Sequence, residues 1–159
     1  MVFMNTSLPR INEETDLIEF DEGGRTFKLH PNALEAWKLM KQCAEAHGIM
    51  LKLISAFRSI ERQKEIIENK KRKGLKEEEI FRINTPPGFS EHHSGRALDL
   101  GTDSCPDLDE EFGNSEAFKW LDGNGSRFGF RLSYPRNNVF GISYEPWHWL
   151  YEKPIQRFT

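Results

Sequence analysis

The sequence predicts an α+β fold in which helices pack on one face of a mainly antiparallel sheet. The chain has 159 residues, a length that fits one domain and can bury a core without disulfides. Short segments with strand-type apolar patterns are interspersed with segments of helical spacing, and no internal repeat or low-complexity tract is present. We therefore expect a single domain over residues 1–159.

The composition excludes several classes of protein. Hydrophobic residues make up 37% and charged residues 30%, values typical of a folded soluble chain rather than a disordered or membrane-spanning one. The net charge of −3 offers no basic field to a phosphate backbone, so we expect no nucleic-acid partner. Cys43 and Cys105 are too few for a disulfide framework and lack the Cys-x-x-Cys spacing of a zinc or redox pair.

The first part of the chain predicts a hairpin, a helix and a strand. Apolar residues on both sides of a Gly-Gly turn favour a hairpin over residues 15–30. A helix is expected to begin near Pro31 and to stop at Gly48, with a stripe formed by Leu34, Trp37, Lys41 and Ala44. Residues 49–57 are rich in large apolar and branched side chains, as in a mostly buried strand.

The middle of the chain predicts a second helix that leads into a loop and a strand. Ser59 fits the N-cap of this helix and Gly74 its end, and the basic run before Gly74 suits the negative end of the helix dipole. Prolines and a glycine predict a loop over residues 84–89. Residues 97–100 then read as a short buried strand.

The last part of the chain predicts one more helix and two strands. Residues 101–113 form an acidic segment without EF-hand spacing, so a solvated loop is favoured over a calcium site. A helix is expected over residues 115–121, stopped by the turn at 122–125. Strands are expected over 128–134 and 144–151.

Two separated segments, residues 90–99 and 145–148, carry the side chains of a metal site. The candidate ligands are His92 or His93, Asp99 and His148. Two imidazoles and one carboxylate are three protein ligands, which leaves the fourth tetrahedral position of zinc open for water. The remaining carboxylate, Glu145, can act as the general base. Together these residues predict a metallohydrolase.

Each of these residues alone is weak support, since single histidines and acids are more often surface or structural groups. Their sequence context favours burial, because Asp99 lies between leucines and Glu145 and His148 lie among aromatic residues. Buried charged groups need a partner, and a divalent metal is a strong one. His92 and His93 are neighbours that would face opposite sides of an extended chain, and spacing does not decide which one meets the metal.

Several motifs occur in an order that resembles a known family. A Ser-x-His-x-x-Gly-x-Ala-x-Asp motif at 90–99 precedes Glu-Pro-Trp-His at 145–148. The segments at 55–59 and 128–135 are similar to the family's Ser-Gly-Tyr-Arg-Ser and Tyr-Gly-Phe…Arg-Tyr-Pro motifs. Over residues 50–152 the chain thus resembles the VanY-type zinc D-alanyl-D-alanine carboxypeptidases, which are related to D-Ala-D-Ala dipeptidases and phage L-alanyl-D-glutamate endopeptidases. The resemblance implies a hedgehog/D-Ala-D-Ala peptidase-like fold with zinc in a surface cleft.

Position by position, the resemblance assigns roles to eight residues. One zinc ion would be held by His92, Asp99 and His148, and Glu145 would be the catalytic base. The substrate would be held by Arg58 near the scissile bond or carboxylate, by Ser90 and Gln63 at the terminal D-residue, and by Tyr134 along the groove. The alternatives are a surface salt bridge for Arg58, a solvated side chain for Gln63 and ordinary strand packing for Tyr134.

The chain departs from the family pattern at three places. Ala56 and Phe57 replace a Gly-Tyr pair, Ser133 stands where an arginine is usual, and the segment between Pro135 and Glu145 is about two residues short. All three are expected to lie along the substrate, so they bear on which peptide is cut.

The resemblance implies hydrolysis at the D-alanine terminus of peptidoglycan peptides or precursors. The nearest alternative is an endolysin-type L-alanyl-D-glutamate endopeptidase. Another alternative is a zinc-bearing binding module without catalysis, against which the intact Glu145 argues. We expect a monomer without an integral membrane segment. Because no secretory signal is recognisable, the chain is assigned to the cytoplasm by default, with action at the cell wall or in the periplasm after processing or release left open.

Overall fold

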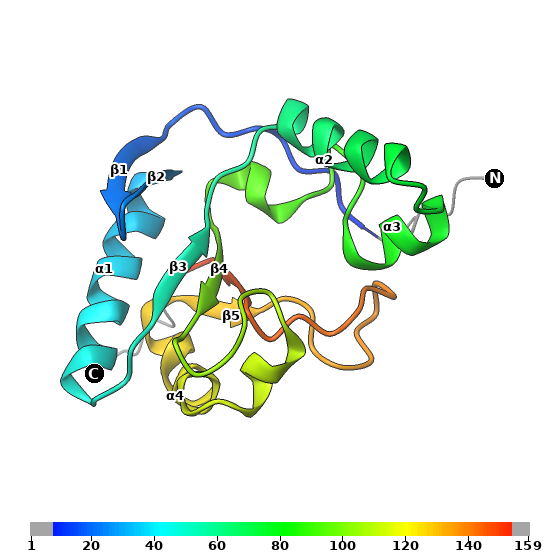
Figure 1. The fold of residues 1–159 in the computed structure, drawn as a ribbon. Coiled ribbons are helices and arrows are strands. Elements are labelled where there is room, and N and C mark those ends of the chain that lie inside the picture. Colours follow the sequence, from blue (N-terminus) through cyan, green and yellow to red (C-terminus); the bar gives the residue numbers. More distant parts are fainter. Residues whose placement is uncertain (1–7, 154–159) are drawn as a thin grey trace.

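The structure is a computed structural model that describes residues 8–153. Its first elements, β1 (Ile18–Glu22) and β2 (Arg25–Leu29), form a two-stranded antiparallel sheet of their own (Figure 1). Phe20 lies opposite Phe27, and the centroids of their rings are 5.9 Å apart. The hairpin predicted over this segment is confirmed.

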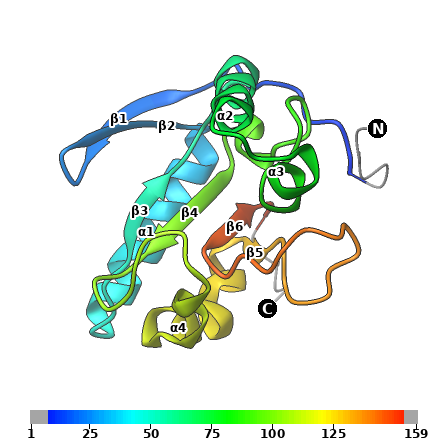
Figure 2. The same ribbon diagram turned by 45° about the vertical axis from the view of Figure 1, so that its right-hand side comes forward.

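Helix α1 (Pro31–Ala46) follows the hairpin and runs along the main sheet (Figures 1 and 2). Pro31 occupies the first turn, where its missing N–H leaves no hydrogen bond unmade. Of the four predicted stripe positions only Lys41 is not buried, and Met40 enters the core in its place. Lys41 instead lies beside Glu22, with its Nζ 3.6 Å from a carboxylate oxygen, since an ammonium group is costly to bury without such a partner.

Four strands form the main sheet in the order β3-β4-β6-β5, and every neighbouring pair is antiparallel. The strands are β3 (Lys52–Ser55), β4 (Ala97–Gly101), β5 (Phe130–Leu132) and β6 (His148–Tyr151). The predicted antiparallel sheet is confirmed, but β3, β5 and β6 are shorter than the segments from which they were expected, whereas β4 extends one residue beyond the predicted 97–100. An apolar pattern indicates that residues are buried, but not that they form hydrogen bonds with a neighbouring strand. Buried residues on either side of a strand can therefore show the same pattern without being part of the sheet.

The two faces of this sheet have different neighbours, because successive strand side chains point to opposite sides. Leu98 of β4 and Trp149 of β6 belong to one hydrophobic core with residues of α1 and of α4 (Glu116–Asn124). Asp99 and His148 alternate with them and line a cleft instead. The sheet therefore separates the core, which is covered by α1 and α4, from the candidate site.

Helices α2 (Ile60–Arg72) and α3 (Glu77–Ile83) border the cleft on the other side of the molecule from α4 (Figure 2). Ser59 caps α2 as predicted, and its hydroxyl accepts the N–H of Arg62 at 3.0 Å. Helix α3 is an addition to the predicted elements. Its first turn consists of three glutamates, which suit the positive end of a helix dipole although they read as a simple charge run.

Helix α4 is longer than predicted. Ser115 caps it, accepting the N–H of Phe118 at 3.1 Å, and the helix continues through Asp122 and Gly123. The helix ends at Asn124, inside the predicted stop at residues 122–125 but three residues beyond its predicted end at Leu121. Gly123 weakens a helix but does not end one, and packing of the preceding turn against the core maintains the helical backbone.

Within residues 8–153, no helix combines the length and apolar character needed to cross a bilayer. The expectation about a secretory signal rests on a segment that includes residues 1–7, which lie outside the described range.

Candidate active site

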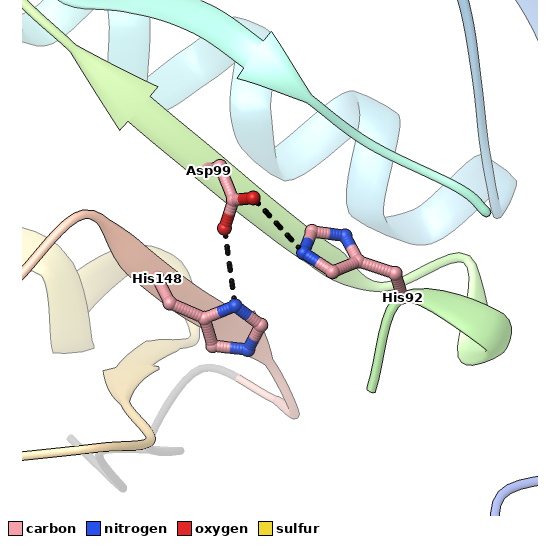
Figure 3. Close-up of side chains that lie close together, drawn as sticks. All are labelled: His92, Asp99 and His148. Atoms are coloured by element: carbon pink, nitrogen blue, oxygen red, sulfur yellow. Dashed lines mark hydrogen bonds and ion pairs between the residues drawn. The ribbon is translucent and has the colours of Figure 1, made fainter. Parts of the chain in front are cut away.

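Three buried side chains from three separate elements converge in the cleft. His92 comes from the 3-10 helix η1 (Glu91–Ser94), Asp99 from β4 and His148 from β6 (Figure 3). Each offers one ligand atom, and these atoms all lie within 4.8 Å of one another. The two histidines contact opposite oxygens of the Asp99 carboxylate, both at 3.1 Å. In the described part of the chain, this cluster has the residue types and spacing to hold a metal ion.

Strand pairing explains why Asp99 and His148 meet. The two residues lie directly opposite each other in the β4–β6 ladder, so their side chains leave the same face of the sheet. The pair spans 49 residues of sequence. Their proximity therefore depends on the register of two strands, which short-range spacing does not reveal.

Hydrogen bonding distinguishes the neighbouring histidines. The Nδ1–H of His92 donates to the carbonyl of Ala56 at 2.7 Å, which leaves its Nε2 facing Asp99. In His93 both ring nitrogens have backbone partners: Nδ1 donates to the Arg58 carbonyl at 2.7 Å, and Nε2 accepts the N–H of Gly88 at 3.1 Å. His93 is fully buried and has no free nitrogen for a metal. The structure thus brings His92, and not His93, into the cluster.

Glu145 lies beside the cluster, at the start of the turn into β6. Its carboxylate is 4.0 Å from Nδ1 of His148, and its backbone N–H donates to the carbonyl of Tyr134 at 3.0 Å. Burial, reinforced by the neighbouring carboxylate of Asp99, raises the pKa of Glu145 to about 7. A carboxyl group with such a pKa can accept and return a proton near neutral pH.

Arg58 and Gln63 form a connected polar wall of the cleft. One guanidinium nitrogen of Arg58 donates to the Gln63 side-chain carbonyl at 3.1 Å and the other to the Ser55 hydroxyl at 3.2 Å. Gln63 is 1% exposed, and its amide donates to the carbonyl of Thr85 at 2.8 Å. Arg58 does not form the alternative surface salt bridge, because no carboxylate among residues 8–153 lies within salt-bridge distance of it. Gln63 is not the alternative solvated side chain, because it is buried.

Ser90 and Tyr134 are also buried in the walls of the cleft. The Ser90 hydroxyl accepts the N–H of His92 and so caps η1. The Tyr134 ring lies 4.9 Å from the imidazole of His148, centroid to centroid. The cleft has a volume of about 310 Å³ and is lined by all eight residues singled out in the sequence.

Two cleft residues escape the sequence reasoning. Glu91 binds His148 from the side opposite Asp99, and Lys70 of α2 donates from its Nζ to the Asn84 side chain at 2.9 Å. Glu91 stands between two motif residues, which could have signalled its importance. Lys70 belongs to the basic run at the end of α2, where it has no distinguishing pattern.

Ser133, which stands where the family pattern has arginine, contacts Glu91 and is not among the residues that line the cleft. The side chain of Ser133 is buried beside the cluster, where its hydroxyl donates to Glu91 at 2.5 Å. Ser133 directly follows β5, and continuing the β5–β6 register by one residue sets it opposite His148, so its side chain leaves the cleft face of the sheet. That this position lies along the substrate stays a prediction.

The fold and the site together define a D-Ala-D-Ala peptidase-like protein, in which an antiparallel sheet presents a His-Asp-His cluster in a cleft. The chain belongs to the VanY family, D-alanyl-D-alanine carboxypeptidase, whose family model matches residues 26–154. This confirms the resemblance and the fold expected from the motifs.

Two curated relatives illustrate the match. YodJ of Bacillus subtilis (strain 168), assigned to the carboxypeptidases, is 33% identical over 158 residues, covering 91% of this chain and 56% of the relative. A D-alanyl-D-alanine carboxypeptidase of Enterococcus faecalis is 36% identical over 118 residues, covering 68% of this chain and 42% of the relative. The chain thus spans about half the length of these relatives.

Three solved structures share the fold over most of their length. The LdcB LD-carboxypeptidase has a TM-score of 0.77 and 33% identity, covering 90% of this chain and 71% of that one. VanYB in complex with D-alanine-D-alanine has a TM-score of 0.73 and 28% identity, covering 95% and 84%. A point mutant of the D,D-pentapeptidase VanY from a VanB-type resistance cassette, in complex with Zn(II), has a TM-score of 0.71 and 26% identity, covering 95% and 86%.

Proposed function

We propose that the chain is a zinc-dependent D-alanyl-D-alanine carboxypeptidase that removes the terminal D-alanine from peptidoglycan stem peptides or precursors. The observation that carries the proposal is the meeting, in one cleft, of the His-Asp-His cluster, the Glu145 carboxylate and the Arg58 guanidinium. A metal site, a base and a cation for an anionic substrate group are the parts that metal-assisted peptide hydrolysis requires.

The cluster fits one zinc ion by the chemistry of its donors. Two imidazole nitrogens and one carboxylate oxygen are a common ligand set of catalytic zinc, and His92, Asp99 and His148 present them from buried positions. The complex of the VanY relative with Zn(II) supports this assignment. When bound, zinc supplies an activated water and polarises the scissile carbonyl.

Glu145 is the proposed general base. Its carboxylate lies on the Nδ1 side of His148, close to the cluster, and burial keeps its pKa near neutrality. It accepts the proton of the attacking water and then returns a proton to the amine of the departing D-alanine. The backbone hydrogen bond to Tyr134 fixes the turn that carries Glu145.

The remaining cleft residues are proposed to hold the peptide. The Arg58 guanidinium, held by Gln63 and Ser55, is a fixed donor for an anionic oxygen of the substrate. Ser90 and Gln63 would hold the terminal D-residue, and Tyr134 would line the groove beside the reacting bond. The complex of VanYB with D-alanine-D-alanine supports a ligand of this kind.

The test is hydrolysis of defined muropeptides by the zinc-loaded protein, followed by mass spectrometry. Loss of one D-alanine from a peptide ending in D-Ala-D-Ala is expected, and Glu145→Gln should lower its rate by about 10²–10⁴-fold while zinc remains bound. Glu116→Gln is the matched control, because that side chain is 78% exposed on α4 and should leave the rate unchanged. A Glu145→Gln variant that releases D-alanine at the parental rate would contradict the assignment.

A second candidate is an L,D-carboxypeptidase, which the similarity to LdcB favours. The same assay separates the two, because an L,D-enzyme takes D-alanine from peptides that end in a single D-alanine. An internal cut between L-alanine and D-glutamate would instead indicate the endolysin-type activity. Retained zinc without hydrolysis of any of these peptides would indicate a binding module.

Domain organisation, assembly and compartment are part of the same proposal. We propose one domain over residues 1–159 that acts as a monomer, in the cytoplasm by default or at the cell wall or in the periplasm after processing or release. Light scattering of the purified protein would test the monomer, and fractionation of the cells that produce it would test the compartment.

A further inference from the structure

His148 has a second carboxylate partner besides Asp99. Glu91, a residue of η1 that lies 57 positions earlier in the chain, places its Oε1 2.9 Å from Nε2 of His148. The same oxygen accepts the Ser133 hydroxyl at 2.5 Å. The Glu91 side chain is only 14% exposed, so it forms these bonds with little competition from water.

The partner of each nitrogen fixes which nitrogen of His148 is free for a metal. Oε1 of Glu91 accepts the Ser133 hydroxyl and lies 2.9 Å from Nε2 of His148, and a carboxylate oxygen in such bonds accepts rather than donates. Nε2 of His148 must then carry the proton. Nδ1, which faces Asp99 and Glu145, is left as the ligand atom.

His92 is arranged in the reverse sense. Its Nδ1–H is taken by the neutral carbonyl of Ala56, and its Nε2 faces Asp99. The two imidazoles therefore present different nitrogens to the same point, at an angle of 85° between their planes. The group that accepts the N–H of His148 is the Glu91 carboxylate, which also accepts the Ser133 hydroxyl, whereas the N–H of His92 goes to a neutral backbone carbonyl.

We propose that Glu91 is a positioning residue that sets the tautomer and orientation of His148 as a zinc ligand, and that Ser133 holds Glu91 in place. The inference rests on the zinc site of the proposed function. A carboxylate that accepts the outer N–H of a ligand histidine orients the ring and strengthens its bond to the metal. It also gives a physical role to Ser133, which stands where the family pattern has arginine.

The competing interpretation is direct contact of Glu91 with substrate, because Glu91 also lines the cleft. The two roles have different signatures. A positioning residue changes how long zinc stays bound when no substrate is present. A substrate contact changes KM at saturating zinc and leaves zinc retention unaltered.

The experiment measures the rate at which the zinc-loaded protein loses its metal to excess chelator. The dissociation rate is chosen because it reports on the loaded site alone, whereas affinity also includes proton competition for free His148. Glu91→Gln keeps the shape of the side chain and removes its charge, while Glu91→Ala also removes the acceptor. Zinc loss is expected to accelerate about 10-fold in the first variant and about 100-fold in the second.

Ser133→Ala should accelerate zinc loss several-fold in the parent but not in the Glu91→Ala background, because Ser133 acts through Glu91. Glu116→Gln, the exposed control, should match the parent. Thermal unfolding of each metal-free variant shows whether it is folded, and equal dissociation rates in folded Glu91 variants and parent overturn the positioning role. So does a rise in KM alone. A parent protein that binds no zinc overturns the proposed function as well, which separates the two failures.

Discussion

At the scale of single residues, the chemistry of the cleft is set by which ring nitrogen each histidine has left over. One ring nitrogen of His92 is hydrogen-bonded to a backbone carbonyl, and one ring nitrogen of His148 is hydrogen-bonded to Glu91. In His93 both ring nitrogens are hydrogen-bonded to the backbone. Neighbouring residues of one type therefore perform different tasks, since hydrogen-bond partners rather than residue identity decide what a histidine can bind.

Replacement of the two adjacent histidines should separate a metal ligand from a structural group. His92→Ala is expected to abolish zinc binding in equilibrium dialysis. His93→Ala should keep zinc but lose about 1–3 kcal/mol of stability, because it leaves the Gly88 N–H and the Arg58 carbonyl without partners. Thermal unfolding and zinc content measure both effects, and zinc loss confined to the His93 variant would reverse the assignment.

The protonation of His148 should change when zinc binds. Although burial lowers it, hydrogen bonds to Asp99 and Glu91 raise the pKa of His148 to about 10 in the metal-free protein. Its imidazole is therefore expected to carry both protons at about pH 8 and to lose the Nδ1 proton to zinc while keeping Nε2–H. Nitrogen NMR of the imidazole with and without zinc measures this, and a neutral His148 in the metal-free protein would contradict it.

The sign of the accompanying stability change follows from the raised pKa. Protonated His148 stabilises the metal-free fold fully below the unfolded pKa of about 6.5. That contribution is lost as the pH rises through about 10.

At the scale of elements, the site is assembled by strand register and by one tight turn. Register sets Asp99 opposite His148, and η1 delivers His92 beside them. The turn ends at Gly95, which has φ +69° and whose carbonyl accepts the N–H of His30. A Cβ at Gly95 would lie 2.7 Å from a methyl group of Leu17.

Gly95→Ala should therefore destabilise the protein by about 1–3 kcal/mol, which lowers Tm by about 2–4 °C per kcal/mol. The cost combines the left-handed backbone with the contact to Leu17. Gly123→Ala is the matched control, because Gly123 lies within α4 with open space around its Cβ position. It should raise stability by about 0.5–1 kcal/mol. Equal effects of the two substitutions would show that backbone conformation at Gly95 is unimportant.

The boundaries of helices were predictable where a nearby capping side chain sets them, and were not predictable where packing against the core sets them. Ser59 begins α2 as expected, because its hydroxyl serves an amide three residues on. Helix α4, by contrast, continues beyond its predicted end at Leu121 to Asn124, because Trp120 and Leu121 pack in the core and hold the last turn. Helix α3 contains a single buried residue, Ile80, so it has little amphipathic pattern to detect.

At the scale of the whole molecule, zinc would connect three parts of the chain, of which the sheet pairs only β4 and β6. Its ligands come from η1, β4 and β6, and a metal bound only by the folded state stabilises that state by mass action.

Removal of zinc with a chelator should therefore lower Tm. At a free zinc concentration of about 100 times Kd, the expected loss is about 2.7 kcal/mol, or roughly 5–11 °C for a chain of this size. Scanning calorimetry measures the shift. The His92→Ala variant serves as the control, since it has no site to empty. An unchanged Tm in the parent would contradict the link between metal and fold.

The sequence by itself determined the residue types, the order of the motifs and the local elements that carry them. Asp99, His148, Glu145 and the pair His92 and His93 were identifiable because metal chemistry restricts the usable side chains to a few types, and the family motif favoured His92. Tertiary structure supplied the physical reason why His92 rather than His93 enters the cluster, and it alone decided that Gln63 is buried and that Glu91 and Ser133 contact each other beside His148. These outcomes depend on contacts between residues that are 42 and 57 positions apart in the chain. Strand register and packing bring such residues together, and short-range spacing in the sequence does not encode either of them.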